Sequence, residues 1–406
     1  MATPLADLRI LDLTRVLAGP VAAQYFGDMG ADVIKIEPID HGDDMRIWPP
    51  FRRSLDGSVT TGAPYFGVNR NKRSIALDLK AEAGREVLWT LVKRADIVME
   101  SFAPGVAARL GIDAATARGL NPSLIHCSIS GFGTVGPMRN SKGYDMIAQA
   151  FAGMLSITGE EGGPPIRTPY SPVDQVTGLH AMVGILAALH ARETTGAGAA
   201  IEVSLFDSAT GLLGHMLQNY WERRTEPGRF GVGHESLCPY EAFATADSPL
   251  ILGVANDTMW QVFCRLTGLE AYINDPRFRT NGERVRNRAE TIALVRPVLL
   301  LRPRNEWCEI LERAGIPCSP LHTLGDLATH PHSQASGMVF DYQHPEFGAM
   351  SAVAQPIRYE GERAELRRAP PGLGEHSIEV LREAGFDDGR IEALAASGVI
   401  RSAKRI

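Results

Sequence analysis

The first part of the chain alternates short apolar runs with longer stretches of mixed polarity. Residues 8–13 (Leu-Arg-Ile-Leu-Asp-Leu) predict a buried strand, and residues 32–37 (Asp-Val-Ile-Lys-Ile-Glu) predict a second one. Between them, Pro20 suits the first turn of a helix that we expect to end at Gly30. Two strands joined in this way form a parallel unit whose crossover is expected to be right-handed.

The same alternation continues further along the chain. Strand-like segments are expected at 74–79, 96–102 and 124–130, with helices over 81–94 and 104–118. Alternation of this kind is typical of an α/β fold, in which helices cover both faces of a mostly parallel sheet.

Helical periodicity dominates from residue 143 onward. The strongest helix is predicted over 174–192, where apolar side chains recur every three or four positions. These side chains are Val176, Leu179, Val183, Leu186 and Leu189. A strand at 200–206 and a helix at 207–222 are expected next.

The later part of the chain begins with a polar, glycine-bearing segment, 223–236, which suggests a linker. A hairpin over 239–256 and several helices are expected after it, whereas 331–337 and 342–350 look rich in loops. Because a chain of 406 residues exceeds what one core usually supports, we expect at least two domains.

Composition limits the class of protein. The formal net charge is −6, from 41 basic and 47 acidic residues, which argues against wholesale nucleic-acid binding. No apolar run approaches the roughly 20 residues that a membrane helix needs, and the N-terminus lacks the pattern of a secretory signal. The five scattered cysteines indicate neither a disulfide framework nor a zinc site. We therefore expect a cytoplasmic protein with no metal, no nucleic acid and no membrane association.

Positive charges follow several of the predicted strands. Lys80, Arg109 and Lys142 lie after strand ends, where open α/β sheets bind ligands, and residues 71–73 (Asn-Lys-Arg) precede a strand. Each cation alone is typical of a solvated surface, but a polyphosphate needs several that converge. The pattern GxGxxG occurs at 131–136 without the helix that a dinucleotide site requires, and no P-loop pattern is present. This disfavours an NAD-dependent oxidoreductase.

Asp174 directly precedes the long apolar helix. An aspartate in that place is commonly a helix N-cap. The position also suits chemistry, because the positive end of the helix dipole keeps a carboxylate ionised, and its unperturbed pKa is only about 3.9. An ionised carboxylate is an oxygen nucleophile, and its attack on an acyl thioester would give a mixed anhydride. Both interpretations stay open at this point.

Other polar residues give weaker signals. His126 and Cys127 lie within an apolar strand and are expected in the core. Asp40, Asp43 and Asp44 are expected on a solvated loop rather than at a cation site. No nucleophile-elbow pattern marks a catalytic serine.

Several short sequence stretches occur along the chain in a fixed order. One of them alone is a weak signal, but the ordered set is highly specific for a protein family. They are 13–20 (LTRVLAGP), 30–37 (GADVIKIE), 71–75 (NKRSI), 77–80 (LDLK), 100–102 (ESF), 104–105 (PG), 143–145 (GYD), 174–178 (DQVTG) and 374–376 (GEH). Over nearly its whole length the chain resembles the class III coenzyme A transferases, the CaiB/BaiF family. Residues 231–236 (GVGHES) and 239–243 (PYEAF) look most like the branch that includes succinate–hydroxymethylglutarate CoA-transferase.

The resemblance implies a fold that composition does not show. Members are ring-shaped chains that interlock with a second copy as a homodimer. A Rossmann-like large domain is built from both ends of the chain, with a smaller α+β domain between them. The implied bounds are 1–222 for the N-terminal part of the large CoA-binding domain, 223–329 for the linker and small domain, and 330–406 for the return segment.

The resemblance also assigns residues. It places the catalytic aspartate at Asp174 and contacts to CoA at nine other positions. These are Leu17, Ala18, Leu77, Lys80, Ser101, Phe102, Arg109, Lys142 and Tyr144. Two features depart from formyl-CoA transferase. Pro38 replaces a basic CoA contact, and the tetraglycine loop is absent, with 231–236 as its candidate replacement.

The implied activity is transfer of CoA from an acyl-CoA, with succinyl-CoA as a candidate donor, to a carboxylic acid. Asp174 would form a mixed anhydride and then an enzyme–CoA thioester, with backbone amides at the helix start stabilising the oxyanions. CoA is a substrate here, and no tightly bound cofactor is expected.

Two alternative functions stay open, and the identities of the donor and acceptor acids stay open as well. One alternative is a 2-methylacyl-CoA racemase, whose branch carries histidine where Tyr144 stands. The other is a non-catalytic CoA-binding protein. For a dicarboxylic substrate, Arg15, Arg46 and Arg167 are candidate partners of the distal carboxylate.

Overall fold

The computed structural model describes residues 3–402, and the chain divides into two compact units, each described here by itself. Unit 1 comprises Met1–Ala152, Thr168–His215 and Pro331–Ile406, and unit 2 comprises Gly153–Arg167 and Met216–His330. The longer segment of unit 2 begins at residue 216, whereas the sequence analysis begins the linker and small domain at 223. Unit 2 also includes residues 153–167, which the sequence analysis places in the large domain.

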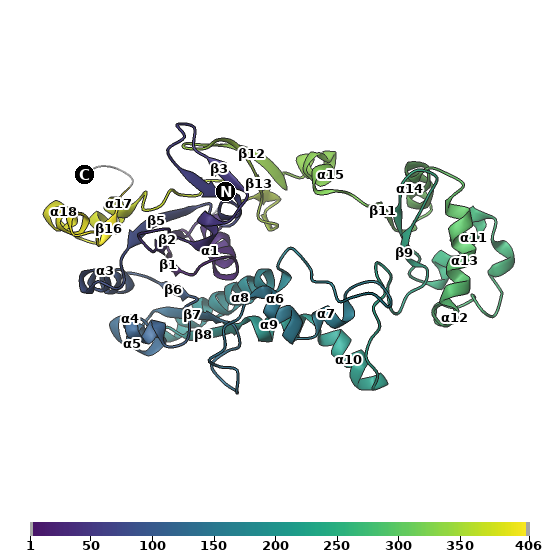
Figure 1. Cartoon of the computed structure of the whole chain (residues 1–406), viewed down its shortest axis with the longest axis horizontal. Helices are drawn as coiled ribbons and strands as arrows, with labels where there is room; N and C mark the ends of the chain where they lie inside the picture. The colour runs from purple at the N-terminus through teal and green to yellow at the C-terminus, as the bar shows by residue number, and fades with distance from the viewer. Residues whose placement is uncertain (1–2, 403–406) are drawn as a thin grey trace. The chain divides into compact units, whose positions relative to one another are not determined.

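A seven-stranded sheet forms the centre of unit 1 (Figure 1), with the order β16–β5–β2–β1–β6–β7–β8. All neighbours pair in parallel except β16, which is antiparallel to β5. The predicted α/β class with a mostly parallel sheet is thus confirmed. The strands are β1 (Arg9–Leu13), β2 (Asp32–Glu37), β5 (Lys72–Leu77), β6 (Ile97–Glu100), β7 (Ile125–Ser130), β8 (Ala200–Ser204) and β16 (Ile400–Arg401).

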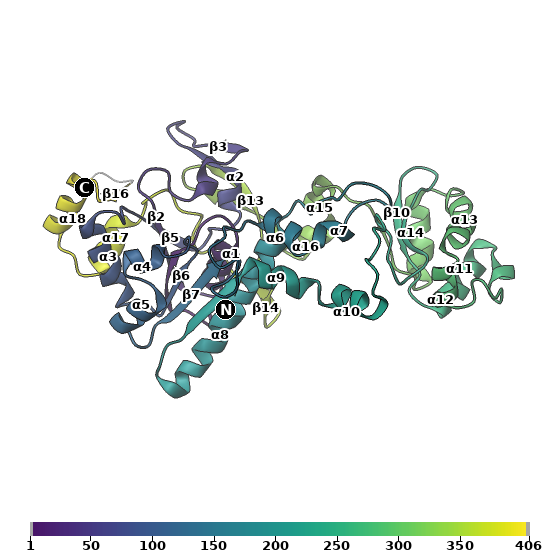
Figure 2. The same ribbon diagram turned by 60° about the horizontal axis from the view of Figure 1, so that its bottom comes forward.

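Helices cover both faces of this sheet (Figure 2), because the central strands are apolar on both sides. On one face, α1 (Ala18–Asp28) packs along α8 (Pro172–Thr195). The other face is closed by helices that share an apolar core with the strands. These helices are α3 (Glu82–Val92), α5 (Ala114–Leu120), α17 (Ser377–Glu383) and α18 (Asp388–Ala396).

Helix α8 differs from its prediction in where it begins and in its hydropathy. It begins at Pro172 and runs for 24 residues. Among residues 3–402 it is the one helix long and apolar enough to cross a membrane by length and composition, with a mean hydropathy of 1.2 over 18 residues, although polar residues interrupt its apolar run. The helix packs against α1, β7 and β8 of unit 1.

Ion pairs made by a buried arginine hold the C-terminal segment against the sheet. Arg73 on β5 pairs with Asp32 at 2.7 Å and with Glu379 and Glu383 on α17, both at 2.8 Å. Its neighbour Lys72 is fully buried. These two cations are therefore paired inside the fold, so the solvated surface, one of the two interpretations considered from the sequence, was wrong for both.

Alternation of polar and apolar residues produces short hairpins that the sequence analysis assigned to loops. Most of the segment expected to be loop-rich, 342–350, lies in the antiparallel pair β12 (Val339–His344) and β13 (Gly348–Val353). Residues 331–335, also expected in a loop, form the helix α16 (Pro331–Ala335). The single helix expected over 207–222 is divided into α9 (Leu205–Leu212) and α10 (Gly214–Arg223).

Unit 2 has its own antiparallel sheet and its own apolar core. The predicted hairpin over 239–256 is present as β9 (Tyr240–Phe243) and β10 (Leu250–Gly253), and β11 (Cys318–Pro320) adds a third strand. Trp260 and Phe263 are among the fully buried side chains of this core. The helices of the core are α11 (Asp257–Thr267), α13 (Arg288–Leu299) and α14 (Arg304–Arg313).

Candidate active site

A cavity of about 280 Å³ opens in unit 1 at the carboxyl ends of β1, β6 and β7. The order of the sheet reverses at β1, which is where open α/β sheets bind their ligands. Seven of the ten residues named from the sequence line this one cavity. They are Leu17, Ala18, Ser101, Phe102, Lys142, Tyr144 and Asp174.

The other three named residues lie elsewhere. Leu77 is buried in the apolar core of the sheet, since β5 is covered on both faces. Lys80 and Arg109 are exposed and do not line the cavity. Contacts of these three with CoA stay predictions.

The cavity also contains charged residues that were not among the CoA contacts assigned from the sequence. Arg15 and Asp44 lie on one wall and form an ion pair at 3.7 Å. Arg139, from the glycine-rich loop after β7, adds a second guanidinium. Arg15 is one of the three arginines considered from the sequence for a distal carboxylate, and Asp44 was expected on a solvated loop, whereas nothing in the sequence marks Arg139.

Asp174 is the third residue of α8, not its N-cap. The N-cap is Ser171, in a left-handed conformation with φ 53°, so the interpretation of Asp174 as the cap was wrong. Helix α8 approaches α1 closely at its start. A Cβ on Gly178 would lie 2.5 Å from the carbonyl oxygen of Ala18, so only glycine permits this contact. The approach sets Asp174 beside the turn that carries Leu17 and Ala18.

The start of α8 is held by a carboxylate from another helix. Asp145, on α6 (Asp145–Phe151), is buried, and its Oδ2 accepts hydrogen bonds from the amides of Val173 at 2.9 Å and Asp174 at 3.1 Å. Gln149 donates to the other oxygen of Asp145. The first-turn amides of α8 are therefore occupied, and the expectation that they stabilise an oxyanion was wrong for these two.

Burial, together with the smaller effect of the neighbouring negative charge of Asp145, raises the pKa of Asp174 to about 7. The expected effect of the helix dipole, a carboxylate ionised well below neutral pH, does not prevail. A more basic carboxylate is a stronger nucleophile once it is ionised.

The structure also shows where the residues lie that gave weaker signals in the sequence. His126 is buried, its Nε2 lies 2.9 Å from the carbonyl oxygen of Ile112, and Cys127 is buried beside it, as expected for core residues. Residues 131–136 form a loop. In the described part of the chain, no three His, Cys, Asp or Glu side chains are placed to hold a metal ion.

Comparison with known proteins identifies the family. Residues 5–377 match the sequence model of CoA-transferase family III. The chain belongs to CoA-transferase family III. This enzyme is 38% identical over 400 residues to the succinyl-CoA:glutarate CoA-transferase of Mus musculus, covering 98% of this chain and 90% of that protein. It is also 38% identical to the succinate–glutarate CoA-transferase of Agrobacterium fabrum, covering 94% of this chain and 95% of that protein.

A solved structure agrees with this assignment. A CaiB/BaiF family protein from Brucella suis superposes with a TM-score of 0.83 at 34% identity, covering 95% of this chain and all of that one. The enzyme is therefore a CoA-transferase, which moves CoA from an acyl-CoA to a carboxylic acid. The resemblance inferred from the ordered motifs is confirmed.

The ionisation of Asp174 gives a direct test of the site. In an NMR titration we expect its carboxyl carbon to titrate near pH 7. Asp145→Asn keeps an oxygen for the two amides but removes the charge, so the midpoint should fall. Asp44→Asn removes another carboxylate of the cavity that does not bind α8, and the shift should be smaller. A wild-type midpoint near 4 would contradict this electrostatic description.

Proposed function

We propose that Asp174 is the nucleophile of the CoA-transferase and is acylated during the reaction. The observation that carries this proposal is that the Asp174 carboxylate lines the same cavity as the turn Leu17–Ala18 and the segment Ser101–Phe102. In the family those two stretches contact CoA. A thioester held there by its CoA portion has its carbonyl presented to a carboxylate, which lowers the entropic cost of the attack.

The proposed steps balance without a cofactor. A carboxylate oxygen of Asp174 attacks the acyl carbon, the C–S bond breaks, and CoA leaves as the thiolate, giving a mixed anhydride. The thiolate then attacks the aspartyl carbonyl, which releases the donor acid and forms an aspartyl–CoA thioester. The acceptor carboxylate repeats the two steps in reverse and restores the Asp174 carboxylate. We therefore propose that CoA enters only as a substrate.

Cations of the cavity are proposed to stabilise the charges that develop. Lys142 lines the cavity together with Asp174 and is a candidate donor to the oxyanion, since the amides at the start of α8 are occupied. Arg139 is a candidate for the phosphate contact that Pro38 does not supply. Lys80 and Arg109 are proposed to contact more distal parts of CoA.

We propose a dicarboxylic acid as substrate, with succinyl-CoA as donor, as in the relatives named for succinate and glutarate. Of the three candidate arginines, Arg46 is buried and bonded through two nitrogens to Glu37. Arg167 is exposed and belongs to unit 2. Arg15 lines the cavity of Asp174, which supports it as the partner of the distal carboxylate.

The assembly is proposed to be an interlocked homodimer of ring-shaped chains, as the family resemblance implies. Apolar side chains exposed on neighbouring helices of unit 1 support a partner: Ile147 and Phe151 on α6, and Val183 on α8. We also propose a cytoplasmic location without membrane or nucleic-acid association, supported by the net charge and by five free cysteines.

Replacing the nucleophile tests the mechanism. Asp174→Asn is nearly isosteric, so we expect CoA transfer to fall by at least about 10⁴-fold, the scale of losing an essential catalytic group. The dissociation constant for CoA should stay within about threefold. Activities measured with succinyl-CoA and glutarate, together with calorimetric CoA binding, check both values. Substantial transfer by the variant would refute the role, and a wild-type chain that binds CoA without transferring it would be a binding protein only.

Arg15 is tested by comparing acids. Arg15→Gln should lower kcat/KM for glutarate by about 10- to 100-fold, the range for a hydrogen bond to a charged group. Butyrate, which lacks the distal carboxylate, should be affected much less. Arg167→Gln is the matched control and should change neither acid. Equal losses for glutarate and butyrate after Arg15→Gln would contradict the assignment.

The assembly is tested in solution. Light scattering should give about twice the chain mass of 44.0 kDa. If the chains interlock, two differently tagged preparations that are mixed under native conditions should not exchange subunits, but should do so after unfolding and refolding. A monomer mass, or rapid exchange, would contradict the proposal.

A further inference from the structure

The turn between β1 and α1 has a backbone conformation that its sequence does not favour. Val16, which lines the cavity, has φ 68°. A β-branched residue rarely adopts this left-handed region, because its side chain crowds the backbone there. Contacts outside the turn must therefore hold it in place.

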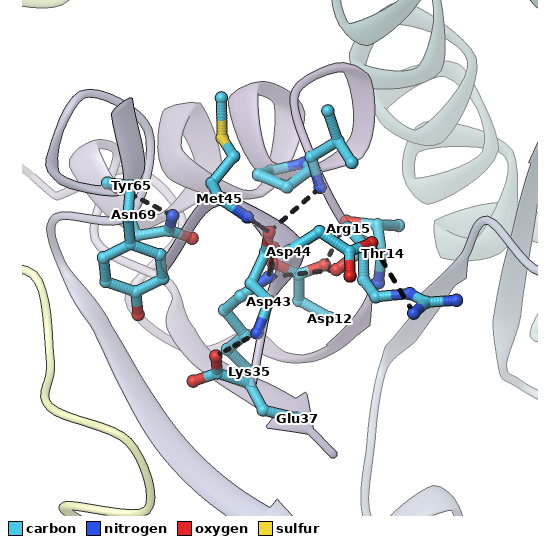
Figure 3. A network of polar contacts seen from close by, with 12 residues as sticks. Asp12, Thr14, Arg15, Lys35, Glu37, Asp43, Asp44, Met45, Tyr65 and Asn69 are labelled. Carbon is cyan, nitrogen blue, oxygen red and sulfur yellow. Dashed lines mark hydrogen bonds and ion pairs between the residues drawn. The ribbon is translucent and has the colours of Figure 1, made fainter. Parts of the chain in front are cut away.

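Lys35 and Asp43 form a buried ion pair that contacts the turn at two points (Figure 3). Asp43 accepts a hydrogen bond from the amide of Val16 through Oδ1 at 3.2 Å. Lys35, on β2, donates to the carbonyl oxygen of Thr14 at 2.9 Å. The Lys35 ammonium and Oδ2 of Asp43 are 2.9 Å apart, and both side chains are fully buried. The expectation that Asp43 lies on a solvated loop was wrong.

Further buried charges fix this ion pair. Asp12 accepts hydrogen bonds from the amide and hydroxyl of Thr14, and its Oδ2 pairs with Lys72 at 2.9 Å. Glu37 accepts a hydrogen bond from the amide of Asp43 at 2.9 Å. This bond holds the backbone of residue 43, from which the carboxylate extends, in place. The side chains that bind the turn therefore have hydrogen-bond or ion-pair partners of their own, which lie on strands of the sheet or in the residues that follow β1.

A purely stabilising role does not account for this arrangement. Desolvation of buried charges costs as much as their attraction returns, and apolar residues of the same size often give a more stable protein. What the ion pair adds is a defined place for the turn. Its residues Val16, Leu17 and Ala18 form the wall of the cavity that also contains Asp174.

We propose that Asp43 is a positioning residue of the CoA-transferase, which holds the turn 14–17 in the conformation that binds CoA. Asp43 acts through the Val16 amide and does not line the cavity itself. The inference rests on the proposed function, because it takes the cavity to be the CoA site.

A double-mutant cycle on the full chain tests this role, with CoA itself as the probe in calorimetry. Asp43→Ala removes the acceptor, so we expect the dissociation constant for CoA to rise by about tenfold or more. In a Val16→Gly background the same change should raise it by less than threefold, because glycine adopts φ 68° without help. A merely structural role of Asp43 gives no such coupling to Val16.

The matched control is a buried pair of the same unit that does not touch the turn. Asp28 is buried and pairs with Arg70 at 2.6 Å. Asp28→Asn should lower the Tm while leaving CoA binding within twofold of wild type. If Asp43→Ala does not fold, Asp43→Leu takes its place, because leucine is of similar size and has no acceptor for the Val16 amide, with at least a threefold rise that Val16→Gly suppresses.

The outcomes separate this inference from the proposed function. Unchanged CoA binding in a folded Asp43 variant, or an equal rise in both Val16 backgrounds, would overturn the positioning role. A wild-type chain that does not bind CoA would instead overturn the assignment of the cavity.

Discussion

The hydrogen bonds from the amides of Val173 and Asp174 to the buried carboxylate of Asp145 place the start of α8 and contribute, after burial, to the raised pKa of Asp174. They bring a second negative charge beside a carboxylate that is already poorly solvated. Raising its pKa from 3.8 to about 7 corresponds to about 4 kcal/mol against the ionised form. The proposed aspartyl anhydride and thioester are uncharged at this position, so acylation relieves the repulsion. The same contact therefore positions the proposed nucleophile and favours its acylated state.

A second set of buried charges joins the cavity wall to the far end of the chain. Glu37 binds Arg46, and Arg46 donates to the carbonyl oxygen of Pro371 at 2.9 Å. Ser74 donates to Glu37 and accepts from the amide of Gly374 at 3.0 Å. The C-terminal segment thus contacts the residues that support the turn after β1, although some 300 positions separate them in sequence. Its contribution to the site is mechanical, because it contacts groups that hold the turn and supplies no residue to the cavity wall.

The sequence was sufficient for the parallel sheet and for most of the proposed site, because both rest on local signals. Apolar runs in alternation with helical periodicity predicted the strands, and the stretches around Leu17, Ser101 and Asp174 resembled one family. The buried charges could not be predicted in the same way. Asp43 and Lys72 look like surface residues along the chain, since their partners come from other strands. Asp145 stood in a matching motif, but its hydrogen bonds to α8 depend on tertiary packing. Residues 342–350 were assigned to loops because a short hairpin has too few alternating positions to be distinctive.

The most direct test of the central claim is whether an oxygen atom of the acceptor acid is transferred to the carboxylate of Asp174. An acceptor acid labelled with ¹⁸O in both carboxyl oxygens is incubated with succinyl-CoA and the enzyme, and the peptide that contains residue 174 is weighed by mass spectrometry. If the aspartate forms an anhydride with the acceptor, its carboxylate keeps one labelled oxygen in the first turnover, and the peptide becomes heavier by one ¹⁸O substitution, or by two once further turnovers replace the other oxygen. The donor acid released in later turnovers then also carries label. A peptide that stays unlabelled while CoA transfer proceeds would contradict the account, because the two acids would then exchange CoA without an intermediate on the protein.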